Sequence, residues 1–226
     1  MNSEDKTGCI AHQFDAVALE YDFMAETFHS SGFFLDHLPQ GRQLALDLGC
    51  GSGFTANDLA PHFDHVIAMD LSLDMLRIAQ AKRQPANVLY CQMDVNRLGM
   101  SSKFDYIISQ SVFHHLNDIP AVLENLKQLL KPGGRLVITD VVSERETPPT
   151  IVYIVGAFQE YIPNWKKFGR RTAYRIFRFR VSHHWLTHLA SDHYLSQDTF
   201  CQLYSRHLPD CTFPKAGHVV WDKPAK

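Results

Sequence analysis

Four histidines and an aspartate are clustered in the segment SHHWLTHLASDH, which covers residues 182–193. His184 and His188 are four residues apart, a spacing that places both on one face of a helix and matches helical zinc sites. Trp185 stands where such a site has its catalytic glutamate, so the pattern does not favour a metal. The same histidines could supply a catalytic base, line a substrate pocket or only decorate a helix. The choice depends on what the rest of the chain builds.

A glycine-rich turn follows an apolar run in LDLGCGSG, residues 46–53. Its alternate glycines, which allow a sharp turn and a close approach of the backbone to a ligand, are Gly49, Gly51 and Gly53. Phe54 stands where a dinucleotide-binding fingerprint has its third glycine, and Asp47 precedes the first glycine by two residues. A carboxylate at this place repels a pyrophosphate and attracts a cationic amine or sulfonium compound. The turn therefore favours a positively charged ligand.

Two further acids end the next two expected strands. Asp70 ends HVIAMD, where an acid can accept hydrogen bonds from the two hydroxyls of a ribose. Asp94 ends VLYCQMD, where a carboxylate could accept a hydrogen from an adenine amino group. Because open α/β sheets bind ligands at the carboxyl edge of their strands, these acids and Asp47 predict one ligand site at that edge.

The elements that must position these acids are short β-rich runs that alternate with helical patterns. We expect strands at 43–49, 65–70, 88–94, 104–111 and 134–142, and two closing strands near 211–215 and 217–223, the last antiparallel and at or near a sheet edge. Helical spacing is found in FTANDLAPHF, LDMLRIAQAKR and IPAVLENLKQLL, and a short helix is expected after a cap at Ser196. Strict alternation predicts a mostly parallel, seven-stranded, doubly wound α/β sheet with helices on both faces.

The composition is that of a single globular domain. The chain has 226 residues, of which 45% are hydrophobic and 20% charged, and its net charge of −2 gives no overall basic character that would indicate nucleic acid. Its scattered cysteines indicate reduced thiols in a reducing compartment: Cys9, Cys50, Cys91, Cys201 and Cys211. The N-terminal segment lacks the pattern of a signal peptide, and the longest apolar run, 151–158, is too short to span a bilayer. We expect a cytoplasmic protein without a transmembrane segment.

Residues 10–142 resemble the class I S-adenosylmethionine-dependent methyltransferases. LDLGCGSG is similar to the first motif of that family, AMDLSLDML to the second, CQMDV to the third and FDYIISQSVFHHL to the fourth. LLKPGGRLVITD is similar to the helix and strand that follow, and FDAVALEYD, residues 14–22, to the lid helix of many small-molecule members. The resemblance implies a Rossmann-like fold and S-adenosyl-L-methionine as cofactor. These motifs are specific for the superfamily and say little about the substrate.

The resemblance also implies roles for single residues. Asp47 and the backbone of the glycine turn would hold the methionine part, Asp70 the ribose and Asp94 the adenine amine, while Leu71 and Met75 would pack on the adenine. The whole set of expected cofactor contacts is Phe14, Tyr21, Asp47, Gly49, Cys50, Gly51, Gly53, Asp70, Leu71, Met75, Asp94, Val95, Ser109 and Gln110. For Phe14 and Tyr21, simple packing of an aromatic helix is an equally open interpretation.

Methyl transfer is an in-line displacement, which requires an aligned donor and acceptor and the exclusion of water. A neutral amine needs no base, whereas a phenol or a carbon acid gains from a histidine. SQSVFHHL lacks the Asn or Asp followed by Pro-Pro and an aromatic that amino-methylating enzymes of DNA and of many RNAs and proteins use, and it lacks the acidic magnesium ligands of catechol-type enzymes. The candidate catalytic residues are His115, His184 and His188, and no metal is expected.

The segment 143–195 interrupts the alternation and is expected to be a helical, aromatic-rich insert that determines the substrate. Between residues 161 and 191 it contains no acid and seven bases: Lys166, Lys167, Arg170, Arg171, Arg175, Arg178 and Arg180. This pattern indicates a solvated basic face over an aromatic core, a site for an anionic or aromatic substrate, or contact with an acidic partner or a membrane surface. DNA is not expected as a partner.

The predicted function is methyl transfer from S-adenosylmethionine to an oxygen or nitrogen of a small, aromatic or hydrophobic metabolite. The single domain would comprise N-terminal lid helices (1–42), a cofactor-binding core (43–142), the insert (143–195) and a closing helix and strands (196–226). Two alternatives stay open: a protein that binds the cofactor on this fold in a non-methylating role, and a methyltransferase for a peptide, a protein or RNA. The sequence predicts no oligomeric state.

Overall fold

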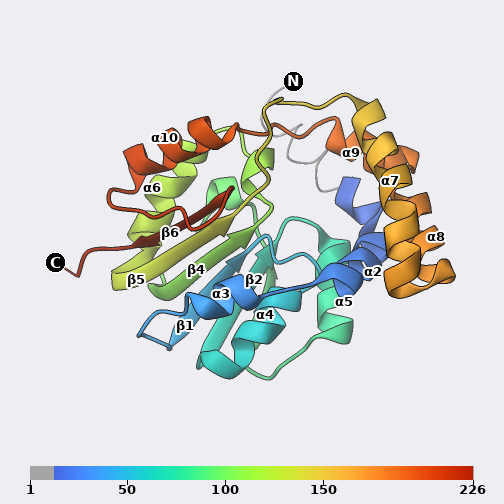
Figure 1. Cartoon of the computed structure of the whole chain (residues 1–226). Helices are drawn as coiled ribbons and strands as arrows, with labels where there is room; N and C mark the ends of the chain where they lie inside the picture. Colours follow the sequence, from blue (N-terminus) through green and yellow to red (C-terminus); the bar gives the residue numbers. More distant parts are fainter. Residues whose placement is uncertain (1–12, 226) are drawn as a thin grey trace.

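Six strands form one sheet in the computed structural model, which describes residues 13–225 (Figure 1). The strands are β1 (Leu44–Leu48), β2 (His65–Asp70), β3 (Val88–Gln92), β4 (Phe104–Gln110), β5 (Leu130–Thr139) and β6 (His218–Asp222). Their order across the sheet is β3-β2-β1-β4-β5-β6, in which β6 alone pairs antiparallel, with β5. The sheet is therefore mostly parallel and ends on an antiparallel edge strand, as the sequence predicts.

Helices cover both faces of the sheet (Figure 1). One face carries α6 (Ile119–Leu129) and α10 (Gln197–His207), whose buried side chains pack on Leu46, Leu48 and other residues of the strands. The other face carries α3 (Gly32–Asp36), α4 (Phe54–Leu59) and α5 (Leu73–Lys82). Strands buried on both faces read as continuous apolar runs, which explains the weak alternation in β1 and β4.

Local capping agrees with the expected helix starts. The Ser196 hydroxyl accepts a hydrogen bond from the Thr199 amide and thereby caps α10, and Ser72 does the same for α5 through Met75. Three short 3-10 turns lie between the main elements: η1 (Ala60–His62), η2 (Val95–Arg97) and η3 (Phe113–His115).

The expected seventh strand near 211–215 does not form in the described part of the chain. Thr212 makes a single isolated bridge with Val220, in which each amide donates to the other carbonyl at 2.9 Å. Pro214 follows two residues later and has no amide hydrogen, so the ladder cannot continue. The prediction of seven strands was wrong at this position. Strand β5 also differs from its expected range, because it begins at Leu130 and ends at Thr139.

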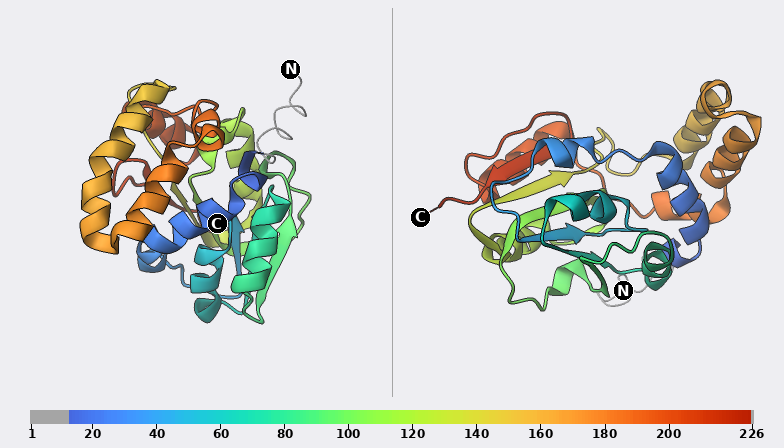
Figure 2. Two further views of the ribbon diagram at one scale, coloured as in Figure 1. Left: turned by 90° about the vertical axis from the view of Figure 1, so that its right-hand side faces the viewer. Right: turned by 90° about the horizontal axis from the view of Figure 1, so that it is seen from below.

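Three helices follow β5: α7 (Thr150–Phe168), α8 (Arg170–Arg180) and α9 (His183–Leu189). Gly169, at φ 84°, ends α7 and separates it from α8. The two helices pack on each other as a hairpin at one end of the molecule (Figure 2). The hairpin contacts α2 (Ala18–Phe28), where the rings of Phe28 and Phe168 meet edge to face at 5.3 Å. Helix α2 thus lies between the hairpin and the carboxyl edge of the sheet. Residues 1–12 of the expected lid region and Lys226 lie outside the described residues.

Candidate active site

The glycine turn connects β1 to α4 at the carboxyl edge of the sheet. A Cβ at Gly49, which has φ 69°, would lie 2.2 Å from Cγ2 of Val112, so only glycine fits there. Gly51 has φ 52°, and a Cβ there would meet nothing within 4 Å. The backbone at Gly51 therefore faces open space, into which a ligand can approach.

Asp47 is buried beside this turn with an unsatisfied carboxylate. Asp47 is 2% exposed, and its Oδ2 has no hydrogen-bond partner among the described residues. Burial, and then the charge of Asp70, raise the pKa of Asp47 to about 7. A buried carboxylate without a partner is costly, and a cation placed beside it removes that cost. The free carboxylate oxygen of Asp47 can therefore accept a hydrogen bond from the ammonium group of an amino-acid ligand.

Asp70 is held rigidly at the end of β2. Its Oδ2 accepts a hydrogen bond from the amide of Gly51 at 2.7 Å, and its Oδ1 accepts one from the amide of Ser72 at 2.8 Å. Burial raises the pKa of Asp70 in spite of these hydrogen bonds. Each oxygen keeps a second lone pair, so the carboxylate can still accept from a pair of hydroxyls.

Asp94 follows β3 and caps η2. Its Oδ1 accepts hydrogen bonds from the backbone amide and the side-chain amide of Asn96, at 2.9 and 2.8 Å. The three acids predicted at the carboxyl edge are therefore brought to one region by β1, β2 and β3, which are neighbours in the sheet.

Two adjoining cavities occupy this edge. Asp47 lines the second of them. The residues that line both of them are Tyr21, Gly49, Gly51, Gln110 and Ser111. The two cavities therefore meet at the glycine turn, and together they form one elongated site.

Most of the expected cofactor contacts line these cavities. The first is lined by Phe14, Tyr21, Gly49, Gly51, Asp70, Leu71, Met75, Asp94, Val95 and Gln110 from that set, and the second adds Asp47 and Cys50. Ser109 lines neither, because it is fully buried and its hydroxyl donates to the carbonyl of Leu48. Gly53 also lies behind the site, where a Cβ would be 2.6 Å from the Tyr90 hydroxyl. Asn96 and Asn117, which sequence reasoning missed, line the first cavity.

Aromatic rings close the first cavity. Phe14 and Tyr21 meet edge to face at 5.7 Å, and Tyr21 continues to Trp185 of α9 at 5.8 Å. Phe14 in turn contacts the rings of His188 at 4.5 Å and His115 at 5.7 Å. The N-terminal segment and α9, which are distant in the sequence, thus build one aromatic wall.

Of the three candidate catalytic histidines, His115 alone lines the two adjoining cavities. Its Nδ1 lies 3.1 Å from Oδ1 of Asp192, a carboxylate that is 1% exposed and accepts a hydrogen bond from the Tyr194 hydroxyl at 2.7 Å. Burial lowers the pKa of His115, so the ring is neutral at pH 7. Burial acts to raise the pKa of Asp192, but the neighbouring histidines, His115 first, lower it. A neutral imidazole beside a buried carboxylate is suited to accept a proton.

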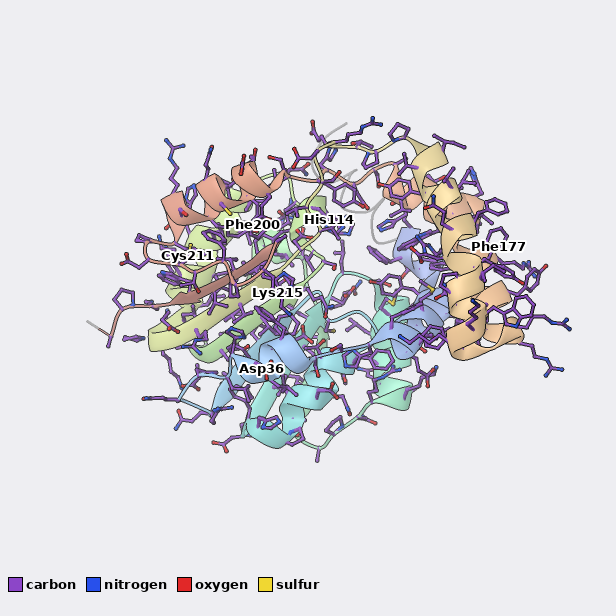
Figure 3. The ribbon with its side chains drawn as sticks, viewed as in Figure 1. Asp36, His114, Phe177, Phe200, Cys211 and Lys215 are labelled. Atoms are coloured by element: carbon purple, nitrogen blue, oxygen red, sulfur yellow. The ribbon has the colours of Figure 1, made fainter. Side chains whose placement is uncertain are left out.

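His114, labelled in Figure 3, is buried and lines neither of the two adjoining cavities. Its Nδ1 donates to Oδ1 of Asp140 at 2.5 Å, and its amide donates to Oδ2 of the same residue at 2.8 Å. Burial acts to lower the pKa of His114, but the hydrogen bond to Asp140 raises it. The two contacts with Asp140 hold His114 in place.

The two candidate catalytic histidines of α9, His184 and His188, have different surroundings. His188 is buried between Phe14 and Trp185, its Nε2 lies 4.0 Å from Oδ1 of Asp192, and burial lowers its pKa to about 4. His184 is exposed and lines a separate groove between α2 and α8, together with Arg175 and Arg178. The packing of α9 therefore brings His188 toward Asp192 and turns His184 away from the cofactor cavities.

Asp192 and Asp140 were not predicted as site residues. Asp140 directly follows β5, so the rule that identified Asp70 could have found it. Asp192 lies in the histidine-rich segment, but its partner His115 is far away in the sequence and no spacing indicates the pair. Ligand atoms of His114, His115 and Asp192 lie within 4.8 Å of one another, an arrangement that could hold a metal ion. The expectation that the site has no metal stays a prediction.

Comparison with known proteins agrees with this geometry. A family model described as a methyltransferase domain matches residues 46–138. This part of the chain is thus similar to the methyltransferase domains of that family. The domain is similar to an uncharacterized methyltransferase of Mycobacterium bovis, with 33% identity over 107 residues, 47% of this chain and 54% of that protein.

A malonyl-[acyl-carrier protein] O-methyltransferase of Bacillus cereus is 36% identical over 96 residues, 42% of this chain and 36% of that protein. The chain thus spans about half the length, or less, of these curated relatives. Among solved structures, the DhpI–S-adenosylhomocysteine complex aligns with a TM-score of 0.68 over 99% of this chain and 98% of that one, at 16% identity. At that identity the likeness shows a shared fold. The family's cofactor is S-adenosylmethionine, as expected.

Proposed function

We propose that this protein transfers a methyl group from S-adenosylmethionine to an oxygen or nitrogen of a small, aromatic or hydrophobic molecule. The observation that supports this most is the buried carboxylate of Asp47, which lines the second cavity and has an oxygen without a hydrogen-bond partner among the described residues. A cationic amino-acid group satisfies that oxygen, and the neighbouring cavity has two carboxylates, Asp70 and Asp94, that can accept hydrogen bonds from a nucleoside. When bound, the cofactor supplies an activated methyl group on a sulfonium.

The chain's own residues would bind the cofactor in three parts. Asp47 and the open backbone at Gly51 would hold the amino-acid end, and Asp70 would accept the ribose hydroxyls. Leu71 and Met75, which line the same cavity as Asp94, would pack on the base. Each role uses a group whose position is already fixed by backbone hydrogen bonds or by burial, so little ordering is needed on binding.

His115 would remove the proton of an acceptor hydroxyl. Its Nδ1 faces Asp192, which leaves Nε2 to accept the proton, and the negative charge of Asp192 stabilises the imidazolium that forms. Asp192 is itself oriented by Tyr194. An amine acceptor that arrives neutral would use the same cavity without needing this step.

The walls of the first cavity support an apolar acceptor. Phe14, Tyr21, Val112 and Leu116 present rings and aliphatic groups beside His115. Such walls exclude water from the reacting atoms, which strengthens every electrostatic interaction inside. The helices after β5 add Trp185 and His188 behind Phe14, which supports a role for the insert in choosing the acceptor.

The test is a binding and turnover experiment on the purified full chain. Calorimetry should show binding of S-adenosylmethionine at micromolar concentration, and incubation with methyl-labelled cofactor and a panel of phenols, hydroxy acids and amines should release S-adenosylhomocysteine. An absence of micromolar binding would refute the cofactor assignment. Binding without product for every acceptor, with the cofactor recovered unchanged, would favour the non-methylating alternative. Acceptor binding that weakens steeply with salt would favour a peptide, protein or RNA substrate.

A further inference from the structure

Helix α7 exposes a row of large apolar side chains along its outer flank. These residues, which we call the α7 stripe, are Ile151, Val155, Phe158, Ile162 and Trp165, with exposed fractions of 61%, 45%, 62%, 48% and 45%. Their spacing of four and three residues places them on one face of the helix. The inner face of α7 contributes different residues to the packing, including the buried Ala157 and Asn164. The ring of Phe158 also contacts that of Phe177 on α8 at 4.9 Å, but the stripe as a whole is exposed over nearly the whole helix.

The bases of the insert lie at the C-terminal end of this stripe. Lys166 and Lys167 directly follow Trp165, and Arg170 and Arg171 open α8 across the break at Gly169. Lys166, Arg170 and Arg171 have no acidic partner among residues 13–225. The sole acid between residues 150 and 180 is Glu160, which pairs with Arg180. The surface thus combines an apolar row with unneutralised positive charge.

We propose that the α7 stripe and these bases dock on an anionic lipid surface. Exposed apolar side chains, a tryptophan and neighbouring lysines and arginines on one helix are the combination that binds the boundary between headgroups and acyl chains. No helix within the described residues is long and apolar enough to cross a membrane, so the helix would lie on the surface rather than span it. Trp165, next to the lysines, has the amphipathic ring that prefers this boundary.

Charge argues against the other occupants of this surface. A two-fold contact through the hairpin would pair residues of the hairpin with one another, and Glu160, its one acid between residues 150 and 180, already pairs with Arg180. A hydrophilic acidic protein would neutralise the bases but leave the apolar row exposed to water. Soluble proteins rarely expose large apolar patches in this way. An anionic bilayer surface satisfies both parts together.

The position of α7 would give this docking a consequence for the site. Arg175 of α8 pairs with Glu20 of α2 at 2.8 Å and lies over the ring of Phe23, so the hairpin is attached to the helix that carries Tyr21 (Figure 2). The entrance region of the cavities would then lie near the lipid. Docking itself does not depend on methyl transfer, so either proposal can fail without the other.

The test uses the full chain and vesicles of phosphatidylcholine with or without an equal share of phosphatidylglycerol. We expect co-sedimentation with the anionic vesicles, a weaker association with the neutral ones, and a blue shift of tryptophan emission that disappears in Trp165→Phe. Phe158→Glu should weaken partitioning roughly tenfold or more, because it puts a charge in place of a ring that would enter the lipid. Lys166→Glu with Lys167→Glu should also weaken it, by about tenfold at low salt.

Leu89→Glu is the matched control, since Leu89 is 62% exposed on β3, an edge strand remote from the hairpin in sequence. It should bind vesicles as the unmodified chain does, and cofactor binding should show that every variant is folded. Equal binding by Phe158→Glu and the unmodified chain, or no binding to anionic vesicles, would overturn the proposal. A dimer in light scattering that Phe158→Glu dissociates, without vesicle binding, would assign the stripe to a second copy.

Discussion

Asp192 holds three histidines from two distant segments around one carboxylate. His115 and His114 come from η3 after β4, and His188 comes from α9. Only His115 combines contact with Asp192 and access to the described cavities. At the scale of single residues, Asp192 lines neither cofactor cavity, but its carboxylate contacts His115, which lines the first one.

Changing Asp192 to Asn should lower turnover with a hydroxyl acceptor by about 100-fold while leaving the affinity for S-adenosylhomocysteine unchanged. Asn keeps the size of the side chain but cannot stabilise the imidazolium of His115. The pKa of His115 lies below its ordinary value of 6.5, so the kcat of the unmodified protein should fall only below pH 6.5. Asp192 acts to raise this pKa, so its replacement should move the acidic limb further down. The measurement is the pH dependence of kcat.

His184→Gln serves as the control for this variant, because His184 is exposed and lies outside the cofactor cavities. Its turnover should remain within about twofold of the unmodified protein. A full rate in Asp192→Asn with a phenol or alcohol acceptor would show that His115 does not act as the base. A lower rate with an unmoved pH profile and a lower melting temperature would indicate a purely structural role.

Cofactor affinity should rise with pH through the titration of Asp47. Its pKa of about 7 means that the carboxyl is mostly protonated at pH 6 and mostly ionised at pH 8. Since only the ionised form attracts an ammonium group, the Kd of S-adenosylhomocysteine should fall by about tenfold over this interval. Isothermal calorimetry at several pH values would measure it.

Asp47→Asn should bind the cofactor more weakly at pH 8 and lose most of this pH dependence. Asp64→Asn is a matched control, because Asp64 is an exposed acid just before β2, at the opposite edge of the sheet. It should retain the dependence. If Asp47→Asn still shows the tenfold change, another group titrates and the assignment of the amino-acid end is wrong.

At the scale of elements, α2 is fixed over the cavities by a buried ion pair. The Asp22 carboxylate is 1% exposed and accepts hydrogen bonds from Lys82 at 2.5 Å and from Arg83 at 2.9 Å, both at the end of α5. Burial acts to raise the pKa of Asp22, but the contacts with Lys82, Ser52 and Arg83 lower it. Helix α2 is thus held to the core by charge as well as by its aromatic rings.

Asp22→Asn should reduce the free energy of unfolding at pH 7 by about 1–3 kcal/mol, since it leaves the two cations without their partner. A lowered folded-state pKa stabilises the fold above the unfolded value near 4, and this contribution is lost as the pH falls through the folded value. The difference between the variant and the unmodified chain should therefore shrink below pH 4. Urea unfolding at pH 7 and at lower pH would measure both.

Glu20→Gln on the same helix is the control, because its pair with Arg175 is about half exposed on both sides. Its effect should stay within about 0.5 kcal/mol. Equal losses in the two variants would mean that the Asp22 pair does not anchor α2.

At the scale of the whole molecule, the cofactor site joins parts that are separate in the sequence. The N-terminal segment, the glycine turn, β2, η2 and η3 all contribute to the two cavities. A ligand that binds there links these parts in the folded state only, so it should raise the stability of the entire domain.

S-adenosylhomocysteine at about 100 times its Kd should therefore raise the melting temperature by roughly 5–10 °C. A chelator such as EDTA should leave both the melting temperature and the turnover unchanged, because we assign His114 and His115 to Asp140 and Asp192 rather than to a metal. Differential scanning fluorimetry and rate measurements would test these results. A loss of activity with EDTA that zinc restores would instead assign the cluster of His114, His115 and Asp192 to a metal ion.

Much of the core was predictable because its signals are local. The apolar runs identify β1 to β5, and the positions of Asp47, Asp70 and Asp94 after or within those runs place them on one edge. In parallel strands the carboxyl ends always share an edge, so no knowledge of distant contacts is needed. The motifs of the turn and of β4 then identify the family without reference to packing.

Other features depend on how distant segments meet. The rotation of α9 against Phe14 and Tyr21 decides the surroundings of its histidines, and His188 is buried beside Phe14 and Asp192 while His184, one turn away, lies in the outer groove. The partnership of His115 with Asp192 and the failure of 211–215 to form a strand likewise depend on tertiary contacts. Periodicity determines which face of an element is apolar, but the packing of elements selects which polar side chains become neighbours. For this protein the cofactor edge follows from the sequence, and the surroundings of the proposed base follow from the tertiary structure.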